Sequence, residues 1–217
     1  MPFKLFKGVN ELSKNTNEVY PVNIHVGCGY NVKTGWHNVD KFQFPGIDQV
    51  LDITKSWPFK NVELVFGEHF FQELSPMEAI NFLIDSGNTL ASNGRIRIST
   101  GNLDWIVRSH WVQGSDVDST FNLNRAFHGW HNKFLWSKEL ISFVLNSIGA
   151  EQISFHDYGE SYDPRLLNLE DHPEAPPLPD GTKQMLIFEF AKTSDLKLPK
   201  ELHDLFEEKY MKFTRMY

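Results

Sequence analysis

Short apolar runs typical of buried strands alternate with helical patterns along this chain, and this alternation constrains its fold more than any other feature. The strand-like runs occupy residues 22–26, 36–40, 48–53, 63–67, 95–100, 151–158 and 184–191. Ser75, Pro76 and Glu78 form the start signal of one helix, which residues 92–94 should end, and Ser137 and Gly149 bound another. Such alternation predicts an α/β protein whose mostly parallel sheet carries helices on both faces.

The composition excludes several classes of protein. The 217 residues carry a formal net charge of -7, which argues against nucleic acid as a partner, because the phosphate backbone requires clustered Lys and Arg. The single cysteine, Cys28, excludes an intrachain disulfide and a cysteine-based zinc site. We find neither a secretory signal nor an apolar stretch of about 18 residues, so we expect a cytoplasmic protein without a membrane partner.

The chain divides into a central domain with appendages. Residues 1–20 are polar, show no clear period and are interpreted as a lead-in, and residues 21–192 form the domain. Within it, residues 113–135 are expected to be irregular and to form a lid or acceptor segment, and residues 159–182 form an acidic, proline-rich loop. Residues 193–217 predict an amphipathic helix that packs on the domain or on a second copy, which leaves a homodimer open.

Ligands of parallel sheets bind beyond the carboxyl ends of the strands, which directs attention to the residues after the first two runs. Gly27, Cys28 and Gly29 form a glycine turn that lets the backbone approach a ligand closely. Asp40 ends the second run, where nucleotide-binding folds place a carboxylate that accepts hydrogen bonds from a ribose diol. Taken singly, each feature is also typical of an ordinary turn.

The next two runs end in similar features. Asp52 and Ile53 pair an acid with an apolar side chain, which suits the amino group and the face of an adenine ring. Glu68 and His69 place two ionisable groups among aromatic residues, which indicates a site. Because all four features fall at predicted ends of neighbouring strands, together they favour a cofactor pocket.

The spacing between the first two runs argues against a dinucleotide. If the first strand ends near Val26 and the second starts near His37, ten residues, 27–36, lie between them, which leaves room for an extended loop or a single turn instead of the usual crossover helix. The turn GCGYNV lacks the third glycine of the dinucleotide fingerprint, and Asp40 follows too soon.

The chain resembles class I S-adenosylmethionine (SAM)-dependent methyltransferases in the ordered segments VNIHVGCGYN, GWHNVD, VLDITKSWPF, VELVFGEHFFQEL and SNGRIRIST. More narrowly, it resembles the short methyltransferase-type-11-related branch with LHLGCG and GWxNVD motifs, over roughly residues 20–192. The resemblance implies a Rossmann-like seven-stranded sheet whose last strand, residues 184–191, lies antiparallel beside residues 151–158. The short first connection fits this cofactor, because SAM has no pyrophosphate to be held at a helix N-terminus.

The resemblance also assigns cofactor-binding residues. It places Gly27 and Gly29 at the methionine part of SAM, Asp40 at the ribose, the pair 52–53 at adenine and the pair 68–69 at the methyl end. The full predicted set is Gly27, Cys28, Gly29, Asn31, Asp40, Lys41, Asp52, Ile53, Glu68 and His69.

The predicted function is methyl transfer from SAM to a small-molecule or glycan acceptor, and the branch suggests glycan pathways only loosely. Gln72 and Glu73 depart from the family pattern EHVLEHL, so a non-catalytic protein that binds SAM or S-adenosylhomocysteine (SAH) is an alternative. A general base is needed only when the acceptor must lose a proton, and His69, His128 and His131 are the candidates.

The segment AFHGWHNKFLW allows two further interpretations. Both of its histidines can make purely structural hydrogen bonds among core aromatic residues. Alternatively, His128 and His131 can bind a divalent metal ion together with Asp116 or Asp118, although the spacing matches no strong ligand motif.

Overall fold

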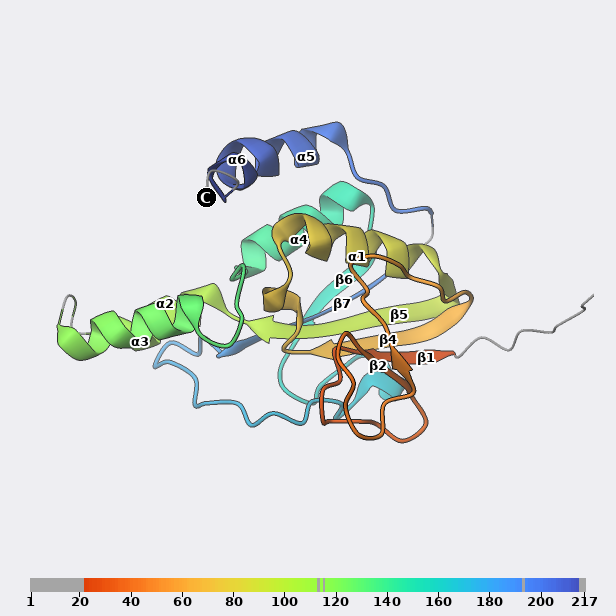
Figure 1. Cartoon of the computed structure of the whole chain (residues 1–217), viewed down its shortest axis with the longest axis horizontal. Coiled ribbons are helices and arrows are strands. Elements are labelled where there is room, and N and C mark those ends of the chain that lie inside the picture. Colours follow the sequence, from red (N-terminus) through yellow and green to blue (C-terminus); the bar gives the residue numbers. More distant parts are fainter. Residues whose placement is uncertain (1–21, 113, 115, 193, 215–217) are drawn as a thin grey trace, which may run out of the picture.

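The computed structural model describes residues 22–112, 114, 116–192 and 194–214, so the lead-in predicted for residues 1–20 lies outside the described residues. Within the described part, seven strands form one sheet in the order β3-β2-β1-β4-β5-β7-β6 (Figure 1). The neighbouring strands from β3 to β5 pair in parallel, whereas β7 is antiparallel to both β5 and β6. The strands are β1 (Asn23–Val26), β2 (His37–Asp40), β3 (Gln49–Val50), β4 (Val62–Glu68), β5 (Leu90–Gly101), β6 (Glu151–His156) and β7 (Met185–Ala191). The predicted Rossmann-like sheet with its antiparallel last strand is confirmed.

The connection from β1 to β2 contains no α-helix, as its length predicts. The two strands pair in parallel from Ile24 opposite His37 to Val26 opposite Val39, so residues 27–36 cross over as an extended loop. Asn38 on β2 holds this loop, because its Oδ1 accepts from the Lys33 N–H at 2.7 Å and its Nδ2 donates to the Lys33 carbonyl at 3.0 Å.

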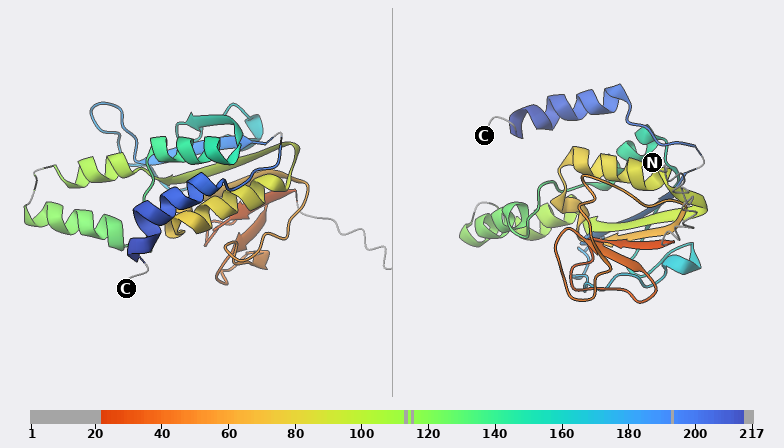
Figure 2. Two further views of the ribbon diagram at one scale, coloured as in Figure 1. Left: turned by 90° about the horizontal axis from the view of Figure 1, so that it is seen from above. Right: turned by 45° about the vertical axis from the view of Figure 1, so that its right-hand side comes forward.

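One face of the sheet is covered by helices (Figures 1 and 2). The helices α1 (Pro76–Asn88) and α4 (Lys138–Ile148) pack on this face, and α5 (Lys200–Phe206) covers α1. Beyond α5 the chain continues through a π-helical turn, Glu207–Met211, into α6 (Lys212–Thr214). The predicted start signal of α1 is present, since a Glu78 carboxylate oxygen accepts from the Ser75 N–H at 2.8 Å.

The opposite face is covered by the connection between β6 and β7, residues 157–184, instead of α-helices (Figure 1). Its only helical piece among the described residues is the 3-10 turn η2 (Pro164–Leu166). Arg97 of β5 lies 2.7 Å from a Glu170 oxygen and 2.6 Å from a Glu189 oxygen, and the three side chains are almost fully buried. The helix layer expected on this face is therefore reduced to η2, and a buried ion triad holds the connection against the sheet.

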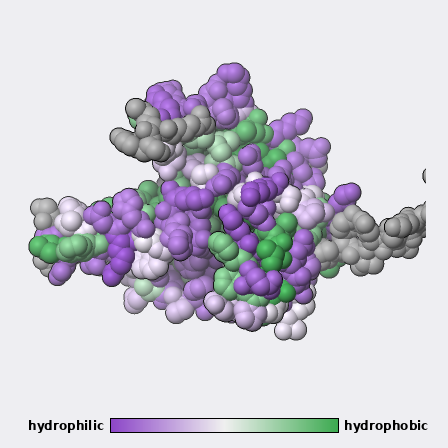
Figure 3. All heavy atoms as spheres, viewed as in Figure 1, coloured by the Kyte–Doolittle hydropathy of each residue, from purple (hydrophilic) through white to green (hydrophobic). Residues whose placement is uncertain are grey.

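The expectation that residues 113–135 are irregular is wrong. After α2 (Leu103–His110), the helix α3 (Val117–His128) forms, and both project from the body as a hairpin (Figures 1 and 2). Asp116 caps α3 by accepting from the Ser119 N–H at 2.7 Å. The helix exposes Val117 and Phe121, and hydrophobic surface appears at the hairpin tip (Figure 3). The buried residues of α3 are the small Ser119 and Ala126, so no large core residues mark this helix in the sequence.

The turn expected at residues 92–94 is also wrong. The helix α1 ends at Asn88, and residues 92–94 lie within β5, which begins at Leu90. A Cβ at Gly94 would lie 2.7 Å from the Val62 carbonyl oxygen, so glycine here permits the close approach of two strands. None of the described helices is long and apolar enough to cross a membrane.

Candidate functional site

A cavity of about 730 Å³ lies at the carboxyl ends of β1, β2 and β4. This volume is within the range of small-molecule sites, and the position is where open α/β sheets bind ligands. The predicted cofactor residues all line it, namely Gly27, Cys28, Gly29, Asn31, Asp40, Lys41, Asp52, Ile53, Glu68 and His69. The fold therefore gathers in one cavity ten residues that are spread over more than forty positions of the sequence.

The glycine turn forms the inner wall of this cavity. Gly27 has a φ of +61°, and a Cβ there would lie 2.5 Å from the Phe70 Cβ, so no larger residue fits. The Gly29 N–H donates to Asp40 Oδ2 at 2.9 Å, and the Phe42 N–H donates to Asp40 Oδ1 at 2.9 Å. Asp40 thereby holds the turns after β1 and β2 together, and each of its oxygens has a further lone pair for a ligand.

Cys28 is a neutral thiol at neutral pH. Its side chain is buried, and burial together with the nearby Asp40 raises its pKa to about 11. Because only the thiolate is strongly nucleophilic, the neutral Cys28 thiol forms part of the cavity wall and does not act as a nucleophile.

Asp52 presents an unsatisfied acceptor. Its Oδ1 accepts from the Thr54 hydroxyl at 2.6 Å and the Thr54 N–H at 3.1 Å, and the hydroxyl bond is the main reason that its pKa is lowered to about 2. Its Oδ2 is buried without a hydrogen-bond partner among the described residues, although Lys41 and Lys55 lie 3.5 and 3.4 Å away as ion-pair partners. A buried ionised acceptor in a cavity wall fits a ligand that carries an N–H donor, such as an adenine amino group.

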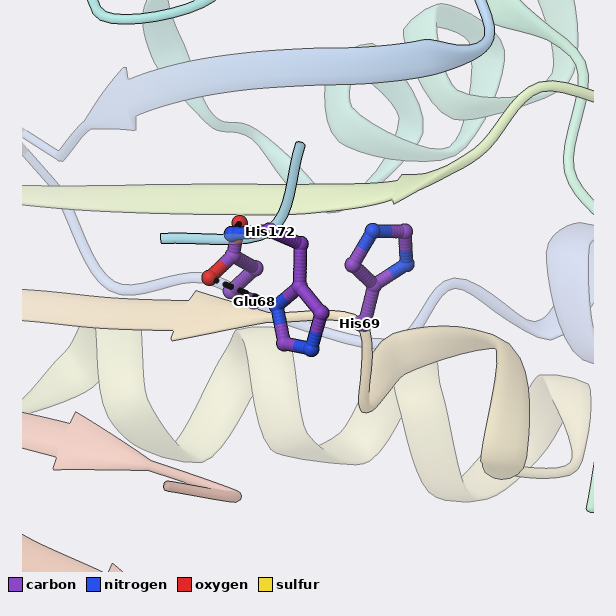
Figure 4. A group of neighbouring side chains, drawn as sticks. All are labelled: Glu68, His69 and His172. Atoms are coloured by element: carbon purple, nitrogen blue, oxygen red, sulfur yellow. Dashed lines mark hydrogen bonds and ion pairs between the residues drawn. The ribbon is translucent and has the colours of Figure 1, made fainter. Parts of the chain in front are cut away.

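Glu68 ends β4 and His69 follows it, and a third ionisable residue, His172, joins them from the 157–184 connection (Figure 4). Glu68 Oε2 lies 3.0 Å from His172 Nδ1, and the rings of His69 and His172 are 4.9 Å apart. His69 has a left-handed backbone with a φ of +56°, which is uncommon among residues other than glycine, although His adopts it more readily than most, and such conformations cluster at functional sites. Burial lowers the pKa of His69, so its imidazole is neutral and can accept a proton.

The other two candidate histidines lie in different places. His131 lines the cavity together with Glu73 and Lys133, whereas His128 is exposed at the end of α3 and does not line it. The metal site suggested for the pair with Asp116 or Asp118 is wrong. The helix α3 has 12 residues and separates those acids from His128 by most of its length, on the order of 15–18 Å.

Sequence reasoning missed several residues of the site, and His172 is the most informative. It lies in the acidic loop, where no strand or motif precedes it, and reaches the cavity only because the loop crosses the sheet. Next to His172, Asp171 Oδ2 forms an ion pair with Lys33 Nζ at 2.6 Å, which fixes this part of the loop. The cavity is also lined by three aromatic residues, Tyr30, Phe42 and Phe44. Tyr30 adjoins the glycine turn and the other two follow β2, and aromatic residues at these places are the signal that could have indicated them.

A second hollow, of about 1170 Å³, lies among α2, β6 and β7. Its lining includes Asp104, Lys138, His156 and Tyr162, and it contains none of the predicted site residues. We therefore take the smaller cavity as the candidate functional site, because convergent polar groups identify a site better than volume does.

Among known proteins, the likenesses of this chain are to solved structures of low sequence identity. No family model and no curated protein matches the sequence. Among solved structures, the plantazolicin methyltransferase BpumL in complex with SAH has a TM-score of 0.47 and 14% identity, over 82% of this chain and 79% of that chain. Human N-acetylserotonin methyltransferase in complex with SAM has a TM-score of 0.46 and 14% identity, over 81% and 48% of the two chains.

A third solved structure, the CMeT domain of the citrinin polyketide synthase, has a TM-score of 0.48 and 12% identity, over 80% of this chain and 47% of that chain. The chain thus spans about half the length of two of these three proteins. At such identities the likeness concerns the fold alone. The function has to be argued from the cavity itself.

Proposed function

We propose that the protein is a SAM-dependent methyltransferase and that the cavity at the ends of β1, β2 and β4 binds SAM. One observation carries this proposal: a single cavity of about 730 Å³ contains the glycine turn and the acids that follow β2, β3 and β4. The strand order and the GCG and NVD segments support the narrower likeness to the short methyltransferase-type-11-related branch.

Each part of the cavity has a matching chemical group in SAM. Asp40 would accept hydrogen bonds from the ribose diol with the lone pairs that its two backbone donors leave free. Asp52 Oδ2, which lacks a hydrogen-bond partner among the described residues, would accept from the adenine amino group, and Ile53 would cover the ring. The turn from Gly27 to Gly29 leaves backbone space for the methionine part.

The charges of the cavity suit a sulfonium ion. Lys41 is near Asp52, and Lys133 is paired with Glu78, so the basic residues of the lining are engaged. Glu68 and Glu73 remain on the wall, and both attract a cation in a site that excludes part of the solvent. This excess of carboxylates favours a positively charged donor over a nucleotide diphosphate.

Methyl transfer needs few groups from the protein beyond those that position the reactants. A lone pair of the acceptor forms a bond to the methyl carbon while the carbon–sulfur bond breaks, and sulfur keeps that electron pair, which yields SAH. Holding the two reactants in line at near-attack distance supplies most of the acceleration. Where the acceptor atom carries a proton, His69 is the preferred base, because it is neutral and lines the cavity, and His131 is the second candidate.

The acceptor fits a small molecule or a glycan better than nucleic acid. The chain has a formal net charge of -7, and the cavity wall near His69 and His131 combines acidic and aromatic side chains with one lysine, Lys133, which is paired with Glu78. Aromatic faces and carboxylates are groups with which proteins bind sugars and neutral metabolites.

Calorimetric titration of the full chain with SAH and SAM tests the proposal. We expect both to bind with one molecule per chain and to raise the melting temperature. Absence of binding by either would refute the methyltransferase assignment. A screen with SAM labelled at the methyl group then identifies the acceptor class, and binding without transfer to any acceptor would favour the non-catalytic alternative.

A further inference from the structure

One wall of the cavity holds a carboxylate and two imidazoles whose donor atoms all lie within 4.8 Å of one another (Figure 4). The residues are Glu68, His69 and His172, and they form the only such group among the described residues. Glu68 is the last residue of β4, His69 follows it, and His172 comes from the connection between β6 and β7, more than a hundred positions later. Such convergence from separate segments is how proteins build metal centres with open coordination positions.

The distances within this cluster suit a metal ion. Neighbouring donors on a tetrahedral or octahedral ion with bonds of about 2.1 Å lie roughly 3.0–3.5 Å apart. Glu68 Oε2 and His172 Nδ1 are separated by 3.0 Å. The third donor, on His69, lies within 4.8 Å of the other two, so a side-chain rotation must bring it closer when the three share one ion.

Hydrogen bonds to the surrounding backbone hold the cluster in place. Glu68 accepts from the N–H groups of Asp171 and His172 at 3.0–3.2 Å, which fixes both the carboxylate and the loop. The Gln72 amide donates to the His69 carbonyl at 2.8 Å, and its oxygen accepts from the Thr100 hydroxyl at 2.9 Å. Outer partners of this kind orient metal ligands and keep them in one geometry.

The backbone of His69 also points to a constrained position. The left-handed backbone of His69, with a φ of +56°, is the kind of local strain that persists where the surrounding structure requires one orientation.

We propose that Glu68, His69 and His172 bind a divalent transition-metal cation at this wall of the cavity. Two imidazoles and one carboxylate favour zinc, cobalt or iron(II) over magnesium and calcium, which prefer oxygen ligands. The three residues leave coordination positions open toward the cavity. A hydroxyl or carboxylate of the methyl acceptor can occupy them, and a bound hydroxyl loses its proton more readily. With His69 bound to the ion, His131 takes the place of His69 as the base.

This role in acceptor binding rests on the proposed function, whereas the binding of the ion does not. The ion would lie in the same cavity as a sulfonium, and the carboxylates of Glu68 and Glu73 reduce the repulsion between the two cations. The inference narrows the acceptor to molecules that offer an oxygen ligand.

The test uses the untagged full chain, stripped with a chelator and titrated with cobalt(II) alone. We expect one cobalt ion per chain and visible absorption bands of a cobalt ion with nitrogen ligands, and zinc should displace the cobalt. His172→Gln and His69→Gln should each weaken binding at least about 100-fold, because loss of a ligand costs more than loss of an outer partner. His203→Gln, on the exposed surface of α5, should leave cobalt binding unchanged.

Thermal unfolding of the metal-free variants checks that each of them still folds. His172 is exposed, so His172→Gln should fold even where a substitution at the buried Glu68 does not. Absence of cobalt binding to the parent chain would overturn the metal site. Binding that both glutamine variants retain would also overturn it, because the ion would then sit elsewhere.

Titration of the stripped protein with SAH separates this inference from the proposed function. SAH binding without cobalt binding would leave the methyltransferase assignment standing and overturn the metal site. Cobalt binding that depends on His69 and His172, without SAH binding, would support the metal site and refute the methyltransferase assignment.

Discussion

The backbone N–H of Gly29 donates a hydrogen bond to Oδ2 of Asp40 at 2.9 Å, so the turn after β1 is fixed to the end of β2. The parallel pairing of the two strands places both residues at the same edge of the sheet. The loop between the two strands contains no helix, so space for the cavity remains next to Gly29 and Asp40. One side chain thus shapes the glycine turn and faces the ligand position.

Asp40→Asn should weaken SAH binding roughly 10–100-fold, because a hydrogen bond to a charged group contributes about 1.5–3 kcal/mol. The amide keeps the size of the carboxylate and one acceptor, so the fold should persist. Isothermal titration with SAH measures the change.

Asp48→Asn is the matched control for this variant. Asp48 also accepts a backbone hydrogen bond, from the Asn38 N–H at 2.8 Å, but it does not line the cavity. It should lower stability and leave the SAH dissociation constant unchanged. Equal losses of affinity in both variants would show that Asp40 acts only on the loop.

The sheet could be predicted from the sequence because its strands carry local signals. The apolar runs of β1, β4 and β7, and the start signal at Ser75 and Glu78, mark their elements without tertiary information. The helix α3 could not be predicted in this way, because it exposes Val117 and Phe121 and its buried residues are small. The strand β5 begins early because Leu90 pairs with Val62, which no local pattern indicates.

The residues of the site also differ in whether the sequence could predict them. Asp40, Asp52 and Glu68 follow strands directly, and parallel strands bring their carboxyl ends together, so their convergence could be predicted. His172 could not, because its place depends on the path of residues 157–184 over the sheet. That path is set by the buried contact of Arg97 with Glu170.

The stability of the fold should fall as the pH is lowered from about 7 to about 5, and His25 should account for much of the change. Burial lowers the pKa of His25 to about 4, so it stays neutral in the folded protein, whereas in the unfolded chain it binds a proton below about pH 6.5. Its contribution is therefore complete above the unfolded pKa and is lost as the pH falls toward the folded one. The free energy of unfolding should fall by about 2 kcal/mol between about pH 7 and about pH 5.

His25→Gln isolates this effect. The variant removes the titrating group from its place beside Asn38 and Phe66, so unfolding by urea should show a flatter dependence on pH, even if stability at neutral pH falls. His203→Gln, at an exposed position, should keep the slope of the parent chain. An unchanged slope in His25→Gln would contradict the assignment.

Gly27 and Gly29 should respond differently to alanine, although both have a positive φ. A Cβ at Gly29 meets no atom within 4 Å, so Gly29→Ala should cost about 1–2 kcal/mol from backbone strain alone. A Cβ at Gly27 would lie 2.5 Å from the Phe70 Cβ, so Gly27→Ala adds a steric clash and should cost about 2–5 kcal/mol. Urea unfolding of the two variants compares them directly, and equal losses would show that Phe70 moves aside freely.

Arg97→Met should lower the free energy of unfolding by about 3–5 kcal/mol, because it leaves two buried carboxylates without their cation. Glu170 and Glu189 lie 2.7 and 2.6 Å from the guanidinium, and the Glu160 carbonyl accepts from it at 2.8 Å. Losing these contacts should also release residues 157–184 from the sheet, so hydrogen exchange there should speed up more than in α1. Lys200→Met is the control, since Lys200 pairs with Asp204 at the surface of α5 and should cost less than about 1 kcal/mol. Similar losses in the two variants, or uniform exchange over the whole chain, would show that the buried triad does not hold this connection.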